Sequence, residues 1–291
     1  MIPRFSLARP RSLTEAFEAF DATGGDAAWL AGGTELLQVM KMGLAQFGTL
    51  IDIKALPELR GLDRTADGSV RIGALTTHRE LERSAVIAEE LPGLARLEAQ
   101  VANVRVRNTG TIGGNLAFAE PHSDPATFFL ACDAVVSLAS ARGRREMGVD
   151  EFVQGPLFTA RDQDELVVDI IVPPPARATG RGYDKIAFFE RPAASVAVRL
   201  AVTDGAIGDA TVAVGSLTEV PTLVPRASAA LRGTEARPET LSTALRSAVD
   251  AFGELDVVAD LNGSADYKRH LAGILLGRAA ERALTEALAR A

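Results

Sequence analysis

Cysteine is nearly absent from this chain of 291 residues, which holds only Cys132. A single thiol excludes an internal disulfide. It also excludes an iron–sulfur cluster held by this chain alone, because such clusters are bound by about four thiolates. Cys132 ends the apolar segment 128–131, so we expect it to be buried as a small hydrophobic side chain. The three histidines lack the spacing of a zinc site, and we expect no metal site.

Long apolar runs and an excess of positive charge are absent as well. Residues 1–5 do not resemble a signal peptide, and no run of about twenty apolar residues could span a membrane. The 38 acidic and 31 basic residues give a formal net charge of −7, which argues against nucleic acid as the main partner. With 47% hydrophobic residues, the sequence predicts a soluble cytoplasmic protein that buries a core without disulfides.

Two common nucleotide-binding signatures are also missing. The first part of the chain has no Gly-x-Gly-x-x-Gly string of the Rossmann type, and no Walker pattern ending in Gly-Lys-Ser/Thr occurs. Two other glycine-rich stretches are present: residues 31–35 (the first glycine segment) and residues 109–115 (the second glycine segment). Adjacent glycines let a ligand approach the backbone N–H groups, and neighbouring Thr and Asn side chains add donors. Together, the segments predict a clamp for the two phosphates of a dinucleotide.

The first part of the chain alternates strand and helix patterns. Helices are predicted at 35–41, from the capping box of Thr77 and Glu80, at 87–101 with a break near 92–93, and from Pro125, with Asp124 as its N-cap. Strands are predicted at 27–30, 49–53, 70–75, 134–139 and 166–172.

The pattern changes after the prolines at 173–175, which cannot continue a strand. Strands at 195–203 and 211–217, turned near 204–205, predict an antiparallel meander. Helices are then predicted at 227–231, 239–252 and 266–289. Strands followed by helices indicate a separate α+β domain.

Seven motifs, taken together, resemble one known family: 31–37, 72–77, 104–117, 121–126, 183–185, 190–191 and 267–272. This family contains the FAD-binding medium subunits of molybdenum hydroxylases, related to xanthine dehydrogenase and aerobic carbon monoxide dehydrogenase. Its flavin domain belongs to the superfamily of vanillyl-alcohol oxidase and p-cresol methylhydroxylase (PCMH). The resemblance implies an α+β fold, with a PCMH-type FAD-binding domain at 1–175 (subdomains of about 1–55 and 56–175). A small domain at 176–291 would follow, with an antiparallel three-stranded sheet plus helices.

The resemblance also implies a function. FAD in this chain would take electrons from the [2Fe–2S] clusters of a small subunit, which a large subunit with a molybdenum–pterin cofactor supplies. The electrons would pass to NAD, O₂ or a quinone-like acceptor. No catalytic acid or base for the organic substrate is expected in this chain.

Residue roles follow from the same resemblance. Asp124 would accept from ribose hydroxyls, unless it is only a helix cap, and Val167 would lie near the isoalloxazine ring, unless it is only a core residue. Lys185 would place positive charge near the flavin or be solvated, and Tyr183 would contact the ring or pack between domains. The FAD pyrophosphate would lie between Ala31, Gly32, Gly33, Thr34 and Glu35 on one side and Thr111, Gly113, Gly114 and Asn115 on the other.

Two other functions stay open at this point. A stand-alone flavin oxidase of the wider superfamily would need a base above the flavin, and the chain offers few candidates. A module that kept the fold and lost the cofactor is the third interpretation, against which both intact glycine segments argue. The basic run 142–145 is read as a solvated turn or as a contact with a partner subunit.

Overall fold

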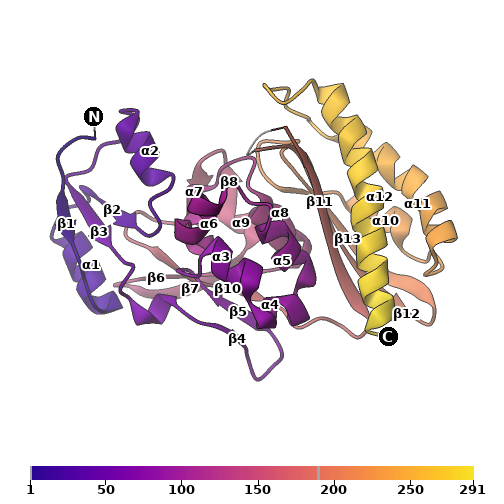
Figure 1. Ribbon diagram of the computed structural model, residues 1–291, viewed down its shortest axis with the longest axis horizontal. Helices are drawn as coiled ribbons and strands as arrows, with labels where there is room; N and C mark the ends of the chain where they lie inside the picture. Colours follow the sequence, from indigo (N-terminus) through magenta and orange to yellow (C-terminus); the bar gives the residue numbers. More distant parts are fainter. Residues whose placement is uncertain (1, 189–190) are drawn as a thin grey trace.

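The structure is a computed structural model, and it describes residues 2–188 and 191–291. Part of the 190–191 motif therefore lies outside the described residues. The elements follow one another along the long axis of the molecule (Figure 1). A small N-terminal sheet lies at one end, a larger sheet with short helices occupies the middle, and a third sheet backed by long helices forms the other end.

The N-terminal subdomain has a parallel sheet with the strand order β1-β3-β2. Ser12 caps α1 by accepting from the Glu15 N–H group, and Gly43 ends α2 in a left-handed conformation with φ +76°. The predicted strand at 27–30 and the helix after it are confirmed, so the first glycine segment is the turn between them. The elements are β1 (Ser6–Ala8), α1 (Leu13–Asp21), β2 (Ala27–Leu30), α2 (Leu36–Lys41) and β3 (Thr49–Asp52).

The middle subdomain is built on an antiparallel sheet with the order β4-β5-β10-β6-β7. Its strands are β4 (Leu62–Arg64), β5 (Val70–Gly73), β6 (Val135–Ser140), β7 (Gly143–Gly148) and β10 (Leu166–Val172), with η1 (Pro57–Leu59) before them and a hairpin of β8 (Val153–Gly155) and β9 (Phe158–Thr159). Its helices are α3 (His78–Arg83), α4 (Ala85–Glu90), α5 (Pro92–Glu98), α6 (Val104–Thr109), α7 (Ile112–Phe118), α8 (Asp124–Ala131) and α9 (Val149–Phe152).

Several local predictions for this subdomain are confirmed, and one is wrong. The capping box of Thr77 and Glu80 starts α3, and Pro92 begins a new helix after the break. Asp124 is not an N-cap: Ser123 takes that position, and Asp124 is the first residue of α8. Its carboxylate instead accepts from Tyr183 and pairs with Lys185, because the fold places residues 183–185, which are distant in the sequence, next to the start of α8.

The C-terminal domain is a meander with the order β11-β12-β13-β14. Its strands are β11 (Thr179–Ala187), β12 (Pro192–Thr203), β13 (Ala206–Gly215) and β14 (Thr222–Leu223). The predicted turn at 204–205 is confirmed, while β11 and the two-residue β14 are additions to the predicted strands. Its helices are α10 (Pro225–Leu231), α11 (Pro238–Asp250), η2 (Ala251–Glu254) and α12 (Ala265–Ala289), and α12 lies along β11 and β12 (Figure 1).

Two glycines of β11 allow α12 to approach the sheet closely. A Cβ atom on Gly180 would lie 1.9 Å from the Ala283 carbonyl oxygen, and one on Gly182 would lie 1.9 Å from the Ala279 carbonyl oxygen. On the helix side, the contacting residues are alanines without exposed surface. Strand and helix therefore meet backbone against backbone, which only glycine permits.

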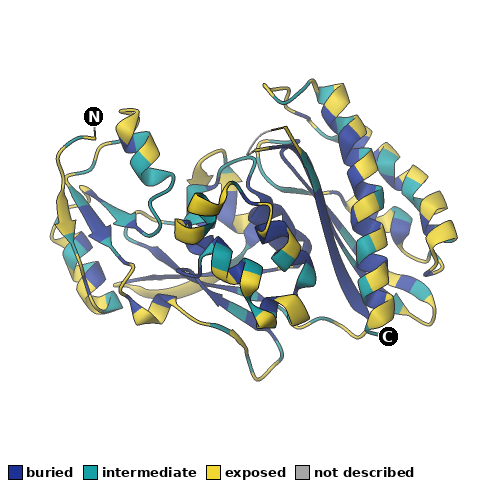
Figure 2. Cartoon of the chain, in the orientation of Figure 1, coloured by how far each residue is buried: buried dark blue, intermediate teal, exposed yellow. Residues whose placement is uncertain are grey.

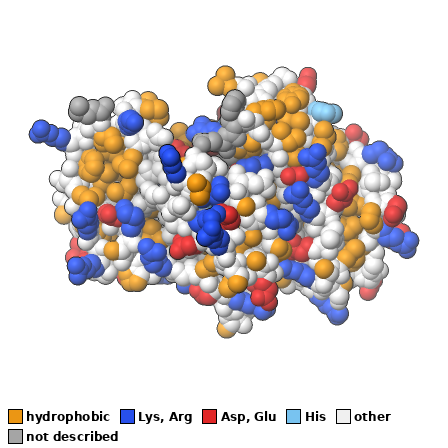
Figure 3. Space-filling view, viewed as in Figure 1, with side chains coloured by type: hydrophobic (Ala, Val, Ile, Leu, Met, Phe, Trp, Pro, Cys, Tyr) orange, Lys and Arg blue, Asp and Glu red, His pale blue; other side chains and the backbone are white. Residues whose placement is uncertain are grey.

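The buried residues form cores that cross the domain boundary, and Figure 2 shows them between the sheets and their helices. Tyr183, Ala197 and Ala213 of the C-terminal sheet belong to the same cluster as the core of the middle subdomain, because α8 packs on β12 and β13. Cys132 is buried, as predicted, and burial raises the pKa of its thiol to about 11. On the face in Figure 3, basic and acidic side chains are intermixed. In the described part of the chain, no helix is both long and apolar enough to span a membrane.

Candidate cofactor-binding site

A cavity of about 470 Å³ runs between the N-terminal and middle subdomains, and both glycine segments line it. Volumes in this range are typical of ligand sites. The turn between β2 and α2 forms one wall, and the start of α7 with the start of α8 forms the other. Of the residues singled out from the sequence, the cavity is lined by Ala31, Gly32, Gly33, Thr34, Glu35, Thr111, Gly113, Gly114, Asn115, Asp124 and Val167.

The first glycine segment presents unused backbone donors. The N–H groups of Gly32, Gly33 and Thr34 donate to no group within residues 2–188 and 191–291. Gly33 has φ +73°, the left-handed conformation that favours glycine, and turns of this kind can gather successive N–H groups on one concave face. Gly32, Gly33 and Thr34 all line the cavity. Glu35 follows at the N-cap of α2, where its side chain makes no capping hydrogen bond.

The second glycine segment differs from the expected loop, because most of it is the first turn of α7. Its backbone donors are used within the fold: the N–H of Gly113 donates to Ala74 O at 2.9 Å, and that of Gly114 donates to Thr111 Oγ1 at 3.2 Å. Ser123 Oγ donates to Asn115 Oδ1 at 2.6 Å, and the Asn115 NH₂ group has no partner in the part of the chain that the structure describes. This wall therefore offers the Thr111 hydroxyl and the Asn115 amide rather than main-chain N–H groups.

Two of the glycines allow close packing around the cavity, between the two glycine segments at Gly32 and against the residue after β5 at Gly113. A Cβ atom on Gly32 would lie 2.2 Å from the Thr109 carbonyl oxygen, and one on Gly113 would lie 2.4 Å from Ala74 Cβ. Gly114 is different, because its Cβ would meet Thr111 Oγ1 at 2.9 Å and then Ala31 at 3.8 Å, across the space between the two segments. Gly32 and Gly113 thus serve packing, and Gly114 keeps the cavity open.

Replacing Gly32 by alanine is expected to lower the free energy of unfolding by about 1–3 kcal/mol, because the new methyl group forces the segments apart. Urea unfolding of the full chain measures this change. Gly253→Ala is the control, since its Cβ would meet nothing within 4 Å. Equal stabilities for the two variants would show that the segments do not need their close contact.

Asp124 lies at the cavity wall within a buried polar cluster. The Tyr183 hydroxyl donates to its Oδ1, Lys185 Nζ lies 2.5 Å from its Oδ2, and Nζ also donates to Gln100 O at 3.0 Å. Burial raises the pKa of the Asp124 carboxyl above its usual value, and the Lys185 charge opposes that rise. Burial and the neighbouring Asp124 carboxylate raise the pKa of Tyr183 well above its usual value. Tyr183 and Lys185 do not line the cavity but contact Asp124, which does. The Lys185 side chain is only 6% exposed, so the idea of a solvated lysine is wrong.

The sequence interpretation missed polar residues at another part of the cavity wall. Arg161 lies there beside Trp29, whose indole N–H donates to Gln163 O at 3.0 Å. Arg161 NH1 donates to three carbonyl oxygens of residues 162–165, and burial lowers the pKa of its guanidinium. No sequence motif marks these residues, because they meet only when the loop before β10 folds against β2.

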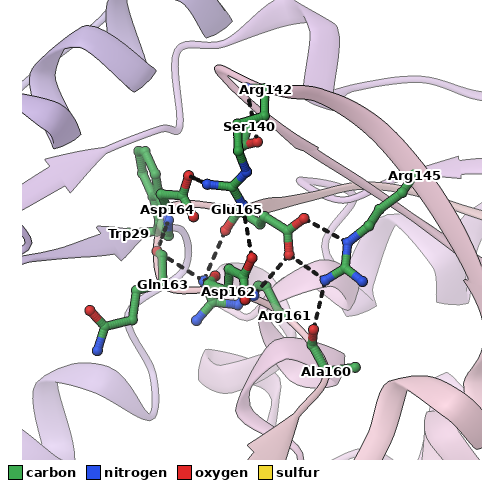
Figure 4. A network of polar contacts seen from close by, with 10 residues as sticks. All are labelled: Trp29, Ser140, Arg142, Arg145, Ala160, Arg161, Asp162, Gln163, Asp164 and Glu165. Atoms are coloured by element: carbon green, nitrogen blue, oxygen red, sulfur yellow. Dashed lines mark hydrogen bonds and ion pairs between the residues drawn. The ribbon is translucent and has the colours of Figure 1, made fainter.

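The basic run at 142–145 braces the same loop, as Figure 4 shows. Arg142 pairs with Asp162 and Asp164, and Arg145 forms a two-bonded pair with Glu165 at 2.7 Å. All three arginines are exposed at the turn between β6 and β7, so the interpretation as a solvated turn is confirmed. Arg142 and Arg145 are in addition paired with carboxylates of this chain. Val167 follows the loop; it is both a core residue and part of the cavity wall.

Comparisons with known proteins agree along almost the whole chain. A family model described as the FAD binding domain in molybdopterin dehydrogenase matches residues 3–175, and one described as the CO dehydrogenase flavoprotein C-terminal domain matches residues 190–283. The chain is 35% identical over 285 residues to the carbon monoxide dehydrogenase medium chain of Hydrogenophaga pseudoflava (95% of this chain, 96% of the relative). It is 33% identical over 279 residues to the nicotine 6-hydroxylase medium subunit of Paenarthrobacter nicotinovorans (95% and 96%).

Solved structures give the same result. A structure of carbon monoxide dehydrogenase from Hydrogenophaga pseudoflava matches with a TM-score of 0.91 at 34% identity, covering 98% of this chain and 99% of that one. Quinoline 2-oxidoreductase from Pseudomonas putida 86 matches with a TM-score of 0.90 at 28% identity, covering 99% of each chain. The predicted α+β fold, with an FAD-binding domain followed by a small C-terminal domain, is therefore confirmed.

Proposed function

Because this chain belongs to the family of FAD-binding medium subunits of molybdenum hydroxylases, we propose that it is the electron-transfer subunit of a three-subunit oxidoreductase. In this proposal it receives electrons from the [2Fe–2S] clusters of a small subunit, which a molybdenum–pterin large subunit supplies. It passes them to NAD, O₂ or a quinone-like acceptor. The names of the relatives, which are medium chains and medium subunits, support partner subunits, and the single cysteine supports clusters held elsewhere. Membership in the family favours this function over the stand-alone oxidase and the cofactor-free module.

One observation carries the cofactor assignment: unused donors face one another across a single cavity. The N–H groups of Gly32, Gly33 and Thr34 stand on one wall, and the Thr111 hydroxyl and the Asn115 amide stand on the other. A pyrophosphate carries negative charge on several oxygens, which suits a site of convergent neutral donors. We therefore assign phosphate binding to these residues, with Ala31, Glu35, Gly113 and Gly114 shaping the space between them.

The remaining contacts follow from burial and charge. Each Asp124 oxygen keeps a lone pair beyond its bond to Tyr183 or Lys185, so the carboxylate can still accept from a ribose hydroxyl. Val167 supplies an apolar wall for a ring system. When bound, FAD supplies a redox centre that accepts electrons singly and releases them as a pair. The protein contributes binding and orientation.

We also propose that the chain divides at 175/176 into the FAD-binding domain and the smaller domain, with a subdomain boundary near 55/56. The family matches at 3–175 and 190–283 support the first division, and the change from the parallel to the antiparallel sheet supports the second. Lys185 then reaches Asp124 from the second domain, so both domains contribute to the site.

The full-length chain, purified alone or with its partners, is expected to carry flavin, which its absorption spectrum would reveal. Gly114→Ala is expected to lower the bound flavin about tenfold or more, because the methyl group enters the space between the glycine segments. Gly277→Ala is the matched control, since Gly277 is also helical and its Cβ would meet nothing within 4 Å. Absence of flavin from both the chain and the complex would contradict the proposed function.

A further inference from the structure

A buried ion pair lies beside the cavity, and none of the roles above uses it. His78, the first residue of α3, is 3% exposed, and Glu98 of α5 has no exposed surface. His78 Nδ1 lies 2.7 Å from Glu98 Oε2. Removing a carboxylate and an imidazole from water costs folding free energy. Buried pairs of this kind are therefore candidates for a functional role.

One carboxylate oxygen of the pair lacks a hydrogen bond, which adds to the free energy that burial of the pair costs. Glu98 Oε1 is buried and has no hydrogen-bond partner in the described part of the chain. An apolar pair of similar volume would avoid that penalty. The imidazole is thus the hydrogen-bond partner of the Glu98 carboxylate, which accepts from Nδ1–H. The second ring nitrogen, Nε2, stays available for another hydrogen bond.

The second nitrogen, Nε2, lies on the side of the ring that faces the second glycine segment. A Cβ atom on Gly110 would lie 3.1 Å from His78 Cδ2 and 3.5 Å from Nε2, and the His78 N–H donates to Gly110 O at 3.2 Å. His78, Gly110 and Thr111 all line the cavity. Within residues 2–188 and 191–291, nothing forms a hydrogen bond with Nε2.

We propose that His78, held in place by Glu98, is a further cofactor-binding residue whose Nε2–H donates to an acceptor atom of bound FAD. This inference rests on the proposed function and deepens it. The first glycine segment offers neutral donors, whereas His78 offers a cationic one, which binds an anionic or electron-rich acceptor more strongly. Glu98 acts as a positioning residue, because it touches only the imidazole.

The charges around His78 support a protonated ring. Burial lowers the pKa of His78, but the Glu98 carboxylate and, from α8, Asp124 outweigh burial, so the pKa lies above its usual value. Arg107 of α6 opposes them, although it pairs with Glu82 of α3 at 3.0 Å. Asp124 is likewise paired, with Lys185. Glu98 is the facing acid whose only ion-pair partner among the described residues is His78.

The test is the FAD affinity of the full-length, flavin-stripped chain between about pH 6 and pH 9, measured by quenching of flavin fluorescence. The wild-type affinity is expected to fall as the pH rises through the raised pKa of His78. At the acidic end, His78→Gln should bind FAD at least about tenfold more weakly than the wild type. Its affinity should no longer decrease as the pH rises. Glu98→Gln should keep the acidic-end affinity, but its fall should begin at a lower pH. His270→Gln, on the exposed face of α12, should match the wild type.

Two results would overturn the inference. One is a His78→Gln variant with wild-type affinity and pH dependence. The other is a Glu98→Gln variant whose affinity falls over the same pH range as that of the wild type. Thermal melts without FAD check that both variants fold, and Glu98→Gln, which keeps the shape of the side chain, still tests the inference if His78→Gln does not fold. A wild-type chain that binds no FAD at any pH would instead contradict the proposed function itself.

Discussion

Replacing Asp124 by alanine is expected to lower the free energy of unfolding by about 3–5 kcal/mol, because the buried Lys185 charge loses its partner. The Tyr183 hydroxyl loses its acceptor at the same time, and Tyr183 is buried. Flavin retention should be lost as well, since Asp124 lines the cavity. Urea unfolding and the flavin content of the purified chain measure the two effects.

A variant in which the whole cluster becomes apolar separates these effects. Asp124→Leu combined with Tyr183→Phe and Lys185→Met removes every buried polar group of the cluster together. It is expected to recover most of the lost stability, because an apolar replacement leaves no unpaired charge. It should still fail to hold FAD. If the combined variant bound flavin like the wild type, the cluster would be a structural element without a role in the site.

Replacing Gly182 by valine is expected to destabilise the C-terminal domain by at least about 3 kcal/mol, at the upper end of the usual cost of overpacking. Its Cβ would lie 1.9 Å from the Ala279 carbonyl oxygen and 3.0 Å from the Ala283 nitrogen. Both are backbone atoms of α12, which cannot move aside as a side chain would. Urea unfolding measures the loss, and the far-ultraviolet circular dichroism spectrum shows how much helix remains.

The control for this prediction is Gly277 of α12, the helix that Gly182 contacts. Gly277→Ala is expected to raise stability by about 0.5–1 kcal/mol, because alanine loses less conformational entropy than glycine in a helix. Its Cβ would meet nothing within 4 Å. Equal and small effects of Gly182→Val and Gly277→Ala would mean that α12 does not need its close approach to β11.

The sequence predicted elements well where one short pattern decides them. The β-branched run of β10 ends at Val172, as expected, because prolines follow. Asp204 and Gly205 both have positive φ, so the turn between β12 and β13 follows from local preferences. By contrast, β11 contains Gly180 and Gly182, which disfavour a strand, and it becomes one because α12 closes on it.

The sequence predicted which segments line the site, but not the local structure of these segments or the partners of their side chains. Two adjacent glycines argue against a helix, yet Gly113 and Gly114 start α7, because Thr111 caps it and Ala74 accepts from Gly113. The proline after Asp124 suggested a local cap, whereas its partners come from β11, about sixty residues later. Contacts between distant segments leave no local pattern, so Lys185, Arg161 and His78 take their places only in the folded chain.

Trp29 gives the chain a property that its other residues do not supply. It is the only tryptophan, its ring stacks on Phe20 with the centroids 4.9 Å apart, and it forms part of the cavity wall. Tryptophan emits in the near-ultraviolet, where flavins absorb, so a flavin in this cavity would quench the emission by energy transfer. The protein thus carries a single, unambiguous optical reporter at the site itself, and occupancy of the cavity can be followed in every variant without attaching a label.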